Sequence, residues 1–331
     1  MATTAHIGDA YRDGEGNWNF SGSYDPDDVI FLLNPARIEP TDIAEKERLI
    51  QSGARHYSEM LSAEPLPDAR YLRLYDMALA ANAARVRHDV ERLARAIADR
   101  PQTAARCVIV SLARAGTPIG ILLKRALRRI GIEAWHYSVS IIRGRGIDEN
   151  ALAYIAQRHG TANAVFVDGW TGKGAIRGEL DRALASGASG FAPFLAVVAD
   201  PAGCADLAAT FDDYVIPGGL LNGIVSGLVS RSVLSDALVG PDDFHACLAM
   251  TEYAASDLSR AYIEAIDGAG DWQPETPPWS AAMAAEIRVA AQATIAEVAA
   301  ECGVSDRNRI KPGIAEATRA ILRRVPDRVY V

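Results

Sequence analysis

The stretch CVIVSLARAGTP, residues 107–118, decides the fold. Its first half is a continuous apolar and β-branched run, which is typical of a strand covered on both faces of a parallel sheet. Its second half is a small-residue turn that leads into an apolar-periodic helix over 117–130. A second stretch, VFVDGWTGKGA at 165–175, repeats the order of strand, small-residue loop and helix. The pair predicts an α/β fold in which helices flank a parallel sheet.

The neighbouring segments predict further elements of this sheet and of two helical extensions. Strands are expected at 28–33, 133–142, 194–199 and 214–216, with core helices at 149–159 and 174–185. Helices outside the core are expected at 41–61, 69–84, 88–100, 242–266, 280–302 and 314–324, with a strand-like end at 328–331. Three parts follow: an N-terminal helical or hood region at 1–103, an α/β core at 104–235 and a C-terminal helical region at 236–331.

Composition excludes several classes of protein. The 331 residues contain no apolar run near the ~20 residues that span a membrane, and residues 1–18 lack a signal-peptide core, so a cytoplasmic protein is expected. The net charge of −8 makes nucleic acid an unlikely partner. Residues 303–331 depart from this average, because seven Arg or Lys and three Asp or Glu give them a balance of +4. The four cysteines show no CxxC pair and are expected to be free thiols.

Both small-residue loops are candidate anion sites, because backbone N–H groups and a helix N-terminus favour negative charge. The first loop comprises Ala113, Arg114, Ala115 and Gly116, and the second comprises Thr171, Gly172, Lys173, Gly174 and Ala175. Asp168, at the expected end of the preceding strand, is suited to a sugar diol. Gly169 and Gly172 are too close for a Walker A motif. An ordinary turn remains the alternative for each loop. Because the two strands are expected to be neighbours at the switch point of the sheet, the loops should face one crevice.

The order of these loops resembles the type I phosphoribosyltransferase fold. SLARAGTP resembles its pyrophosphate loop, VFVDGWTGKGA its ribose-5-phosphate signature, and RGRGID its mobile catalytic loop. Over nearly the whole chain, segments such as EKERLIQSGARHYSEM, LLNGIVSGLVSR and KPGIAEATRAILRR resemble the phosphoribosyltransferase family encoded in bacterial tellurium-resistance and stress gene clusters. That family is often labelled "cysteine protease StiP". Its members often continue into a small RNA-binding-like, Pelota-type domain, and this chain is expected to stop before it.

The resemblance implies transfer of a phosphoribosyl group from phosphoribosyl pyrophosphate to an unidentified small-molecule acceptor in a stress-linked pathway. Asp168 would hold the ribose, Thr171–Ala175 the 5-phosphate and Ala113–Gly116 the pyrophosphate, while Arg143 and Arg145 would close over it. Mg²⁺ would bind mainly through substrate phosphates, without direct protein ligands. A homodimer is common for the fold. Two departures from the family pattern are Gly169, in place of a second acidic residue, and Lys173, in place of a small hydroxyl residue.

An acceptor pocket is expected from a hood segment and from a glycine-rich segment that follows the last strand. Its candidates are Ser52, His56, Glu59, Asn222, Ser226 and Arg231. Two other interpretations remain open: a solvated helix for the hood segment, and close packing of a helix on the sheet for the glycine-rich one.

Two alternatives to the transferase are weighed. A non-catalytic ligand sensor is favoured by Gly169. A cysteine protease ranks last, because it needs an accessible thiolate beside a histidine. Cys107 is expected in a buried strand, and Cys247 is two residues from His245 on an expected helix, where the two side chains diverge. Neither Cys204 nor Cys302 has a histidine nearby in sequence.

Overall fold

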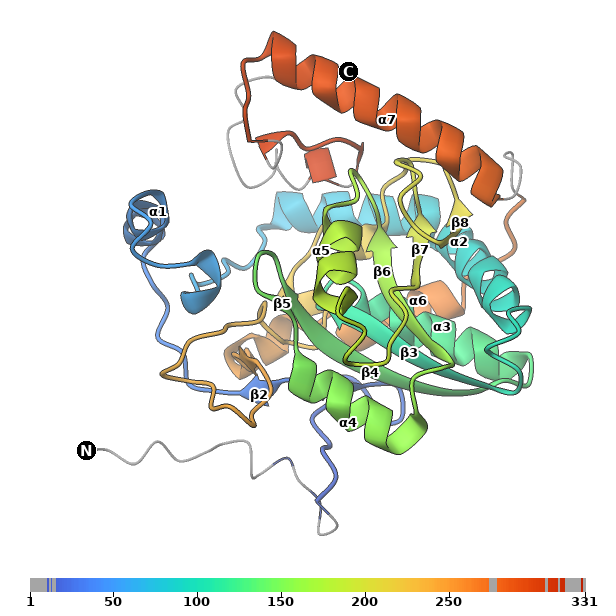
Figure 1. Ribbon diagram of the computed structural model, residues 1–331, viewed down its shortest axis with the longest axis horizontal. Helices are drawn as coiled ribbons and strands as arrows, with labels where there is room; N and C mark the ends of the chain where they lie inside the picture. The colour runs from blue at the N-terminus through green and yellow to red at the C-terminus, as the bar shows by residue number, and fades with distance from the viewer. Residues whose placement is uncertain are drawn as a thin grey trace.

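The computed structural model describes residues 11, 13, 16–273, 279–306, 309–314, 316–318 and 329. In this part of the chain a seven-stranded sheet lies at the centre, flanked by helices (Figure 1), which confirms the expected fold class. The strand order is β1 (Ile30–Leu32), β4 (Glu133–Ile142), β3 (Arg106–Ala113), β6 (Ala164–Trp170), β7 (Leu195–Ala199) and β8 (Leu207–Thr210). These strands are parallel, and β5 (Gly146–Ile147) pairs antiparallel with the end of β4.

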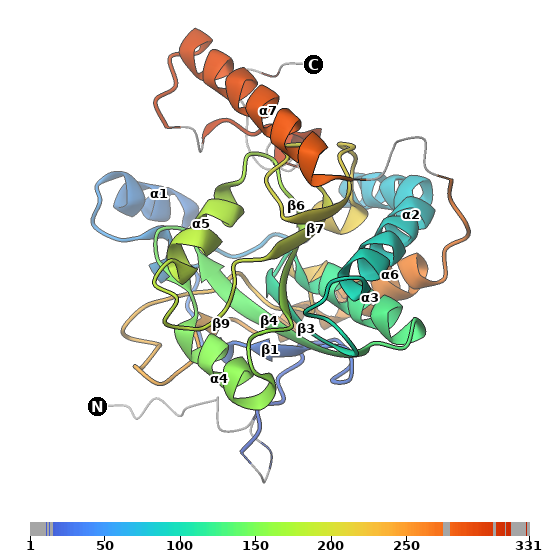
Figure 2. The same cartoon turned by 45° about the vertical axis from the view of Figure 1, so that its right-hand side comes forward.

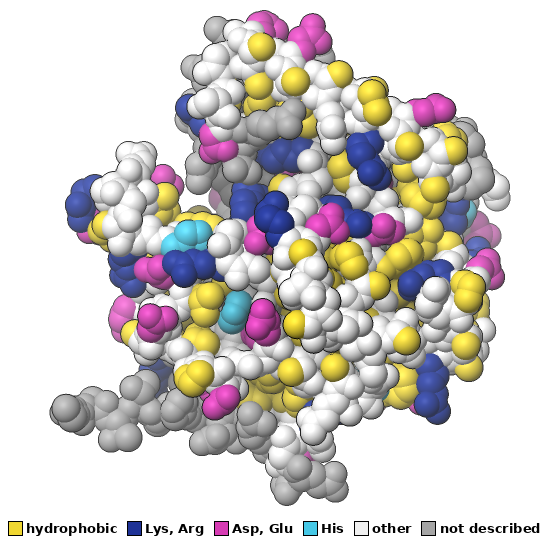
Figure 3. All heavy atoms as spheres, viewed as in Figure 1, with side chains coloured by type: hydrophobic (Ala, Val, Ile, Leu, Met, Phe, Trp, Pro, Cys, Tyr) yellow, Lys and Arg dark blue, Asp and Glu magenta, His cyan; other side chains and the backbone are white. Residues whose placement is uncertain are grey.

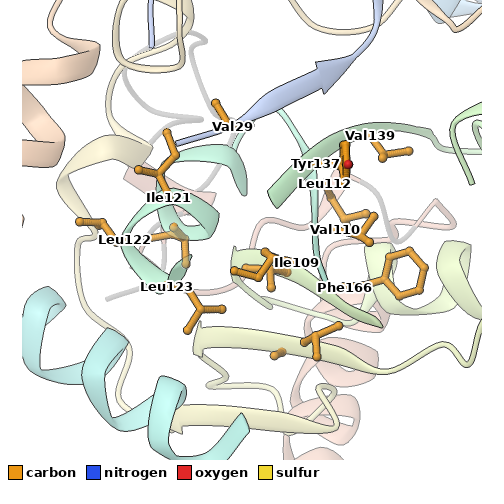
Figure 4. Close-up of a cluster of buried hydrophobic side chains, with 14 of the residues drawn as sticks. Val29, Ile109, Val110, Leu112, Ile121, Leu122, Leu123, Tyr137, Val139 and Phe166 are labelled. Carbon is orange, nitrogen blue, oxygen red and sulfur yellow. The ribbon is translucent and has the colours of Figure 1, made fainter. Parts of the chain in front are cut away.

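The apolar run of β3 forms the middle of the core. Its residues Val108, Ile109 and Val110 are fully buried, as expected for a central strand covered on both faces. Figure 4 shows Ile109 and Val110 of this strand among side chains from β4, β6 and the helix that follows β3. The next strands along the chain lie on opposite sides of β3, with β4 on one side and β6 on the other. A switch point therefore lies at the carboxyl ends of β3 and β6.

Helices cover both faces of the sheet. In Figure 1, α4 (Glu149–His159) and α5 (Ala175–Leu184) lie in front of it, and α2 (Ala69–Ala98), α3 (Thr117–Arg129) and α6 (Ser259–Asp267) lie behind. The start of α4 is fixed by the buried carboxylate of Asp148, which accepts a hydrogen bond from Ala151 N at 3.0 Å. Among the described residues, no helix combines the length and the apolar character that a membrane crossing needs.

One further helix lies across the carboxyl edge of the sheet. Figures 1 and 2 both show α7 (Ala281–Glu301) above the ends of β6 and β7. It is Ala-rich and mostly exposed, and only Ala284 and Ile295 are buried. Figure 3 shows hydrophobic side chains scattered over its outer face, and Lys or Arg side chains gathered in the hollow beneath it.

The smaller elements lie outside the central sheet. A two-stranded parallel sheet pairs β2 (Asn34–Pro35) with β9 (Ala246–Cys247), and α1 (Ile43–Gln51) stands apart from the core. Short 3-10 helices complete the described part: η2 (Tyr57–Glu59), η3 (Pro217–Gly219), η4 (Gly223–Val225) and η5 (Thr251–Ser256).

Several expected elements are wrong in extent near the N-terminus. The helix expected at 41–61 ends at Gln51, because Gly53 takes a left-handed backbone with φ +69° and turns the chain. The helices expected at 69–84 and 88–100 are the single helix α2, which contains no glycine or proline that would break it. The N-terminal region also adds a strand to the core sheet, because β1 pairs with β4.

The expectations after the core are corrected as well. The last strand of the sheet is β8, and residues 214–216 form no strand. Residues 242–266 contain β9, η5 and the start of α6 instead of one helix. The glycine-rich segment is not helical beyond η4, because Gly227 and Leu228 have φ of +78° and +54°. Most of the helix expected at 314–324 and of the strand-like end at 328–331 lies outside the described residues.

Candidate functional site

The two strands that lead into the predicted anion loops lie side by side, as expected. β3 and β6 are parallel neighbours, with Ser111 opposite Val167. At the end of β3, Gly116 approaches β6 so closely that a Cβ there would lie 2.5 Å from the Val167 carbonyl oxygen. Only glycine fits this contact, so the small residues of the first loop serve to bring the two strand ends together.

A cavity opens between these strand ends and the segment after η3. It is lined from the first loop by Arg114 and Ala115, and from the end of β6 by Gly169 and Trp170. The opposite wall includes Gly218, Gly219, Asn222, Ser226 and Tyr262. Asn222 and Ser226, two of the predicted acceptor residues, are thus beside the first loop. The cavity has a volume of about 30 Å³.

Arg114 was expected to bind an anionic ligand, and its guanidinium is instead engaged within the protein. One nitrogen donates to the Val229 carbonyl at 2.7 Å, and another forms an ion pair with Glu64. Glu64 also accepts a hydrogen bond from Gly223 N at 3.2 Å. The positive charge at the first loop is therefore neutralised by Glu64, which no sequence signal marked, because it lies in an irregular proline-containing stretch.

The second loop has a different internal partner. β6 continues past its expected end to Trp170, so Asp168 lies within the strand, where its Oδ1 accepts from Gly169 N at 2.8 Å. The Thr171 hydroxyl donates to the buried carboxylate of Asp200, at the end of β7. Asp200 also accepts hydrogen bonds from Cys204 N and Ala205 N, each at 2.9 Å. Asp200 thus ties the loop after β6 to the loop after β7, and sequence reasoning missed it.

Lys173 is bound by the C-terminal part of the chain. Its Nζ donates to the Ile310 carbonyl at 2.7 Å and to Glu316 Oε2 at 3.1 Å, and its side chain is only 7% exposed. Next to it, a Cβ on Gly172 would lie 2.8 Å from the Pro312 carbonyl oxygen. The loop predicted to hold a phosphate is therefore covered by residues 310–316 of the same chain.

The start of α5 completes this loop. Gly174 has φ +74° and precedes Ala175, the first residue of α5, and no side chain caps the helix there. A Cβ on Gly174 would lie 2.8 Å from Cys204 Sγ. The cysteine thiol is therefore packed against the beginning of α5.

The RGRG turn lies between β4 and β5, and its arginines do not line the cavity. Gly144 N and Gly146 N donate to the carboxylate of Glu179 in α5, at 2.9 and 3.1 Å. Arg143 N donates to the Tyr57 hydroxyl at 2.9 Å, and Arg145 forms an ion pair with Glu59 at 3.1 Å. The turn is anchored by these contacts, and closure of Arg143 and Arg145 over a ligand remains a prediction.

The predicted acceptor residues fall into two groups. Glu59 contacts Arg145, and Arg231 donates to the Tyr57 carbonyl at 2.8 Å, so both lie around η2 rather than in the cavity. His56 accepts from Ser58 N at the start of η2, and burial together with the charge of Arg145 lowers its pKa. Ser52 donates to Leu49 O at 3.1 Å at the end of α1. The structure does not bring these four to Asn222 and Ser226.

The cysteines differ in accessibility. Cys107 is buried in β3, where burial raises its pKa to about 12, and burial also raises the pKa of Cys247 in β9. Cys204 and Cys302 are half-buried. Burial and then the charge of Asp200 raise the pKa of Cys204 to about 11, against the opposing charges of Arg288 and Arg177. Near Cys247, the ring of His245 is hydrogen-bonded to Ser140 Oγ at 2.8 Å.

The described residues contain no group of three or more His, Cys, Asp or Glu side chains that would hold a metal ion. The predicted Mg²⁺ was to bind through substrate phosphates, so that expectation stays a prediction.

Comparison with known proteins gives two family matches. A family described as "Tellurite-like stress resistance cysteine protease StiP" matches residues 22–267, and one described as "PELOTA RNA binding domain" matches residues 289–331. A relative named "Cysteine protease StiP", from Acinetobacter baylyi (strain ATCC 33305 / BD413 / ADP1), is 45% identical over 327 residues, which cover 94% of this chain and 84% of that protein.

Solved structures give a more distant likeness. The hypoxanthine phosphoribosyltransferase of Trypanosoma cruzi is 15% identical, with a TM-score of 0.30, and the match covers 38% of this chain and 75% of that one. The same enzyme in complex with the product IMP is 13% identical, with the same coverage and TM-score. A likeness of this extent identifies neither a reaction nor a ligand.

These findings correct two expectations from the sequence. The expected phosphoribosyl transfer is wrong, because both the matching family and the 45% identical relative are named cysteine proteases, the activity ranked last. The chain was also expected to stop before a Pelota-type domain, whereas the match to that domain begins at residue 289, within the chain.

Proposed function

The chain belongs to the tellurite-like stress resistance cysteine protease StiP family, and from this premise we propose that it is a thiol-dependent hydrolase with Cys204 as its nucleophile. In such a reaction the thiolate attacks the carbonyl carbon of a peptide bond and the amine leaves with a proton. Water then releases the acyl group from sulfur and restores the thiol. The nucleophile must therefore be reachable and able to ionise, and at Cys204 the neighbouring cations that favour ionisation are Arg288 and Arg177 in place of the histidine expected from the sequence.

The observation that carries this proposal is the position of Cys204. It is half-buried at the carboxyl edge of the parallel sheet and packs against Gly174, at the start of α5. Open α/β sheets bind their ligands at this edge, and a helix N-terminus stabilises negative charge such as a thiolate. Arg177 and Arg288 act in the same direction on the pKa of Cys204. Cys107 and Cys247 are fully buried in strands and offer no access to a peptide.

The arrangement in this structure corresponds to a protonated thiol. Burial is the largest cause that raises the pKa of Cys204 to about 11, so the thiolate is scarce at neutral pH. Part of the cover comes from α7, because Arg288 Nε donates to the carbonyl of Gly203, the preceding residue, at 2.6 Å. Removal of α7 from this loop would reduce the desolvation, which is the largest cause of the raised pKa. It would also take away the charge of Arg288, so the charge of Arg177 would remain to favour the thiolate.

The test is hydrolysis of unfolded casein by the full chain and by cysteine variants. Cys204→Ser is expected to abolish hydrolysis while leaving the folded state intact by circular dichroism. Cys302→Ser is the matched control, because Cys302 is also half-buried but lies at the end of α7. The activity of this variant is expected to equal that of the native chain. Full activity in a variant that lacks all four cysteines would exclude thiol chemistry, and loss only in Cys302→Ser would move the nucleophile there.

A second function, RNA binding by the C-terminal part, is supported by the family match at 289–331. Arg309 and Lys311 are exposed there, and positively charged side chains contact RNA phosphates. This proposal departs from the expectation drawn from the net charge of the whole chain. Binding of a short single-stranded RNA should weaken in Arg309→Ala/Lys311→Ala, but not in Arg48→Ala, which removes an exposed arginine from α1. Equal binding by all three proteins would contradict it.

A further inference from the structure

The loop that touches Cys204 also holds a peptide segment of the same chain. This internal peptide comprises residues 310–316, described except for residue 315. Its carbonyl at Ile310 and its carboxylate at Glu316 both accept hydrogen bonds from Lys173 Nζ, at 2.7 and 3.1 Å. Its backbone at Pro312 lies against Gly172, where a Cβ would leave only 2.8 Å to the carbonyl oxygen. Main-chain and side-chain groups of the internal peptide are thus recognised together.

A second attachment fixes the middle of the internal peptide. Ile314 N donates to Asp213 Oδ2 at 2.8 Å, and Gly313, with φ +86°, turns the chain so that a Cβ would lie 3.3 Å from the same oxygen. Burial raises the pKa of Asp213, although the bond from Ile314 opposes this shift. One backbone N–H, one backbone carbonyl and one acidic side chain are therefore bound where the chain turns at Gly313 into a helix, and such main-chain and side-chain contacts together recognise a peptide.

Lys173 and Cys204 belong to one continuous surface. Lys173 is followed by Gly174, whose Cα is in contact with the Cys204 sulfur, and it is preceded by Gly172, which contacts the internal peptide. The internal peptide contacts this loop at Gly172, and the thiol of Cys204 contacts it at Gly174, which are the two neighbours of Lys173 in sequence. An exogenous peptide that takes this place would be positioned next to Cys204.

We propose that Lys173 is a specificity-determining residue that binds an acidic side chain of a peptide substrate, and that Glu316 of the internal peptide occupies this subsite in cis. A substrate subsite presupposes the proposed hydrolase function, so this inference rests on it. The binding of an acidic peptide at Lys173 can nevertheless be measured without any hydrolysis. The ammonium of Lys173 pairs with a carboxylate at 3.1 Å while only 7% exposed, so an uncharged side chain in the same place would leave a buried charge unpaired.

The experiment uses the small number of lysines in the chain, which are Lys46, Lys124, Lys173 and Lys311. Trace acetylation of the full-length protein, read at each lysine by mass spectrometry, reports whether Lys173 is covered, with the exposed Lys311 as the internal reference. Lys173 should react several-fold more slowly than Lys311. In Glu316→Gln the labelling of Lys173 should rise several-fold, whereas the exposed control Glu297→Gln should leave it unchanged. Asp213→Asn alters the second attachment of the internal peptide, and it should also raise the labelling of Lys173.

The subsite itself is tested on Glu316→Gln by adding a synthetic peptide of sequence IKPGIAE, with its amino groups acetylated. This peptide should restore protection of Lys173, and the matched peptide ending in glutamine should protect it less. Equal protection by the two peptides, or by neither, would overturn the acidic subsite. Rapid labelling of Lys173 in the native chain would overturn its occupation in cis. Because each readout is lysine labelling, loss of the Cys204 hydrolase hypothesis would leave these results unchanged.

Discussion

At the scale of single residues, Gly120 shows how tightly the core supports the candidate site. It lies in α3, where a Cβ would stand 2.2 Å from Nε2 of His136. That nitrogen is hydrogen-bonded to Ser111 Oγ at 2.7 Å, and the other ring nitrogen to the Asp28 carbonyl at 3.0 Å. Burial, followed by the charge of Lys124, lowers the pKa of His136 to about 3, so the ring is neutral. The ring cannot move aside without losing one of its bonds.

Gly120→Ala is therefore expected to destabilise the protein by about 1–3 kcal/mol, although alanine is the better helix former. Gly178→Ala in α5 is the matched control, because its Cβ would meet only a flexible arginine nitrogen of Arg182 at 3.5 Å. That change should stabilise the protein by about 0.5–1 kcal/mol. Urea unfolding of both variants measures the difference. Stabilisation by both alanines would show that His136 has room to move.

The partners of the predicted site residues could not be predicted from the sequence alone. Arg114 and Ala115 of the first loop, Asn222 and Ser226 were named from local pattern, and they line one cavity, whereas none of the second-loop residues 171–175 lines it. Their partners are set by the fold instead: Glu64 is 50 residues from Arg114, and Glu316 is 143 residues from Lys173. No local spacing encodes such pairs. Basic residues that appear free in the sequence are therefore neutralised by carboxylates from other parts of the chain.

At the scale of elements, the helices and strands with a pattern in their own residues were predicted better than those that depend on distant pairing. β4 was predicted with its observed bounds, because its aromatic and β-branched residues, such as Trp135, Tyr137 and Val139, favour a strand. The helix at 280–302 was also found, since Ser280 caps α7 and alanines fill it. The helix predicted at 242–266 is wrong, because Ala246 of β9 pairs instead with Asn34 of β2, which is far away in sequence, and with Val233. Elements stabilised by distant pairing leave no periodic pattern of their own.

The RGRG turn is a second case at this scale. Its glycines predicted a loop, and a loop is present between β4 and β5. Its anchoring depends on Glu179, whose pKa burial alone would raise, but which hydrogen bonds from Gly144 N, from Arg182 and from Gly146 N lower overall. A carboxylate from α5 thus satisfies two backbone N–H groups of the turn. This contact follows from the packing of α5 on the hairpin, which a sequence pattern does not contain.

At the scale of the whole molecule, the sheet and its cover differ in how they are held. β3 is buried over nearly its full length, whereas α7 buries only Ala284 and Ile295. Elements with few buried apolar contacts open at a lower free energy than the core does. α7 approaches the site through Gly203, whose Cα lies so close to the helix that a Cβ would be 2.2 Å from the Ala284 carbonyl oxygen. This close contact makes the docking of α7 testable without altering the sheet.

Gly203→Ala should lift α7, and hydrogen exchange should then become faster along residues 281–301 while the amides of β3 stay protected. Gly187→Ala is the matched control, because the φ of +66° at Gly187 is similar to the φ of +61° at Gly203. A Cβ at Gly187, however, would have no neighbour within 4 Å. Both alanines therefore carry the same left-handed strain of about 1 kcal/mol, and only one meets the helix. Faster exchange of α7 in the first variant alone would locate its docking at Gly203. Unchanged exchange there would mean that the contact at Gly203 does not set the stability of α7.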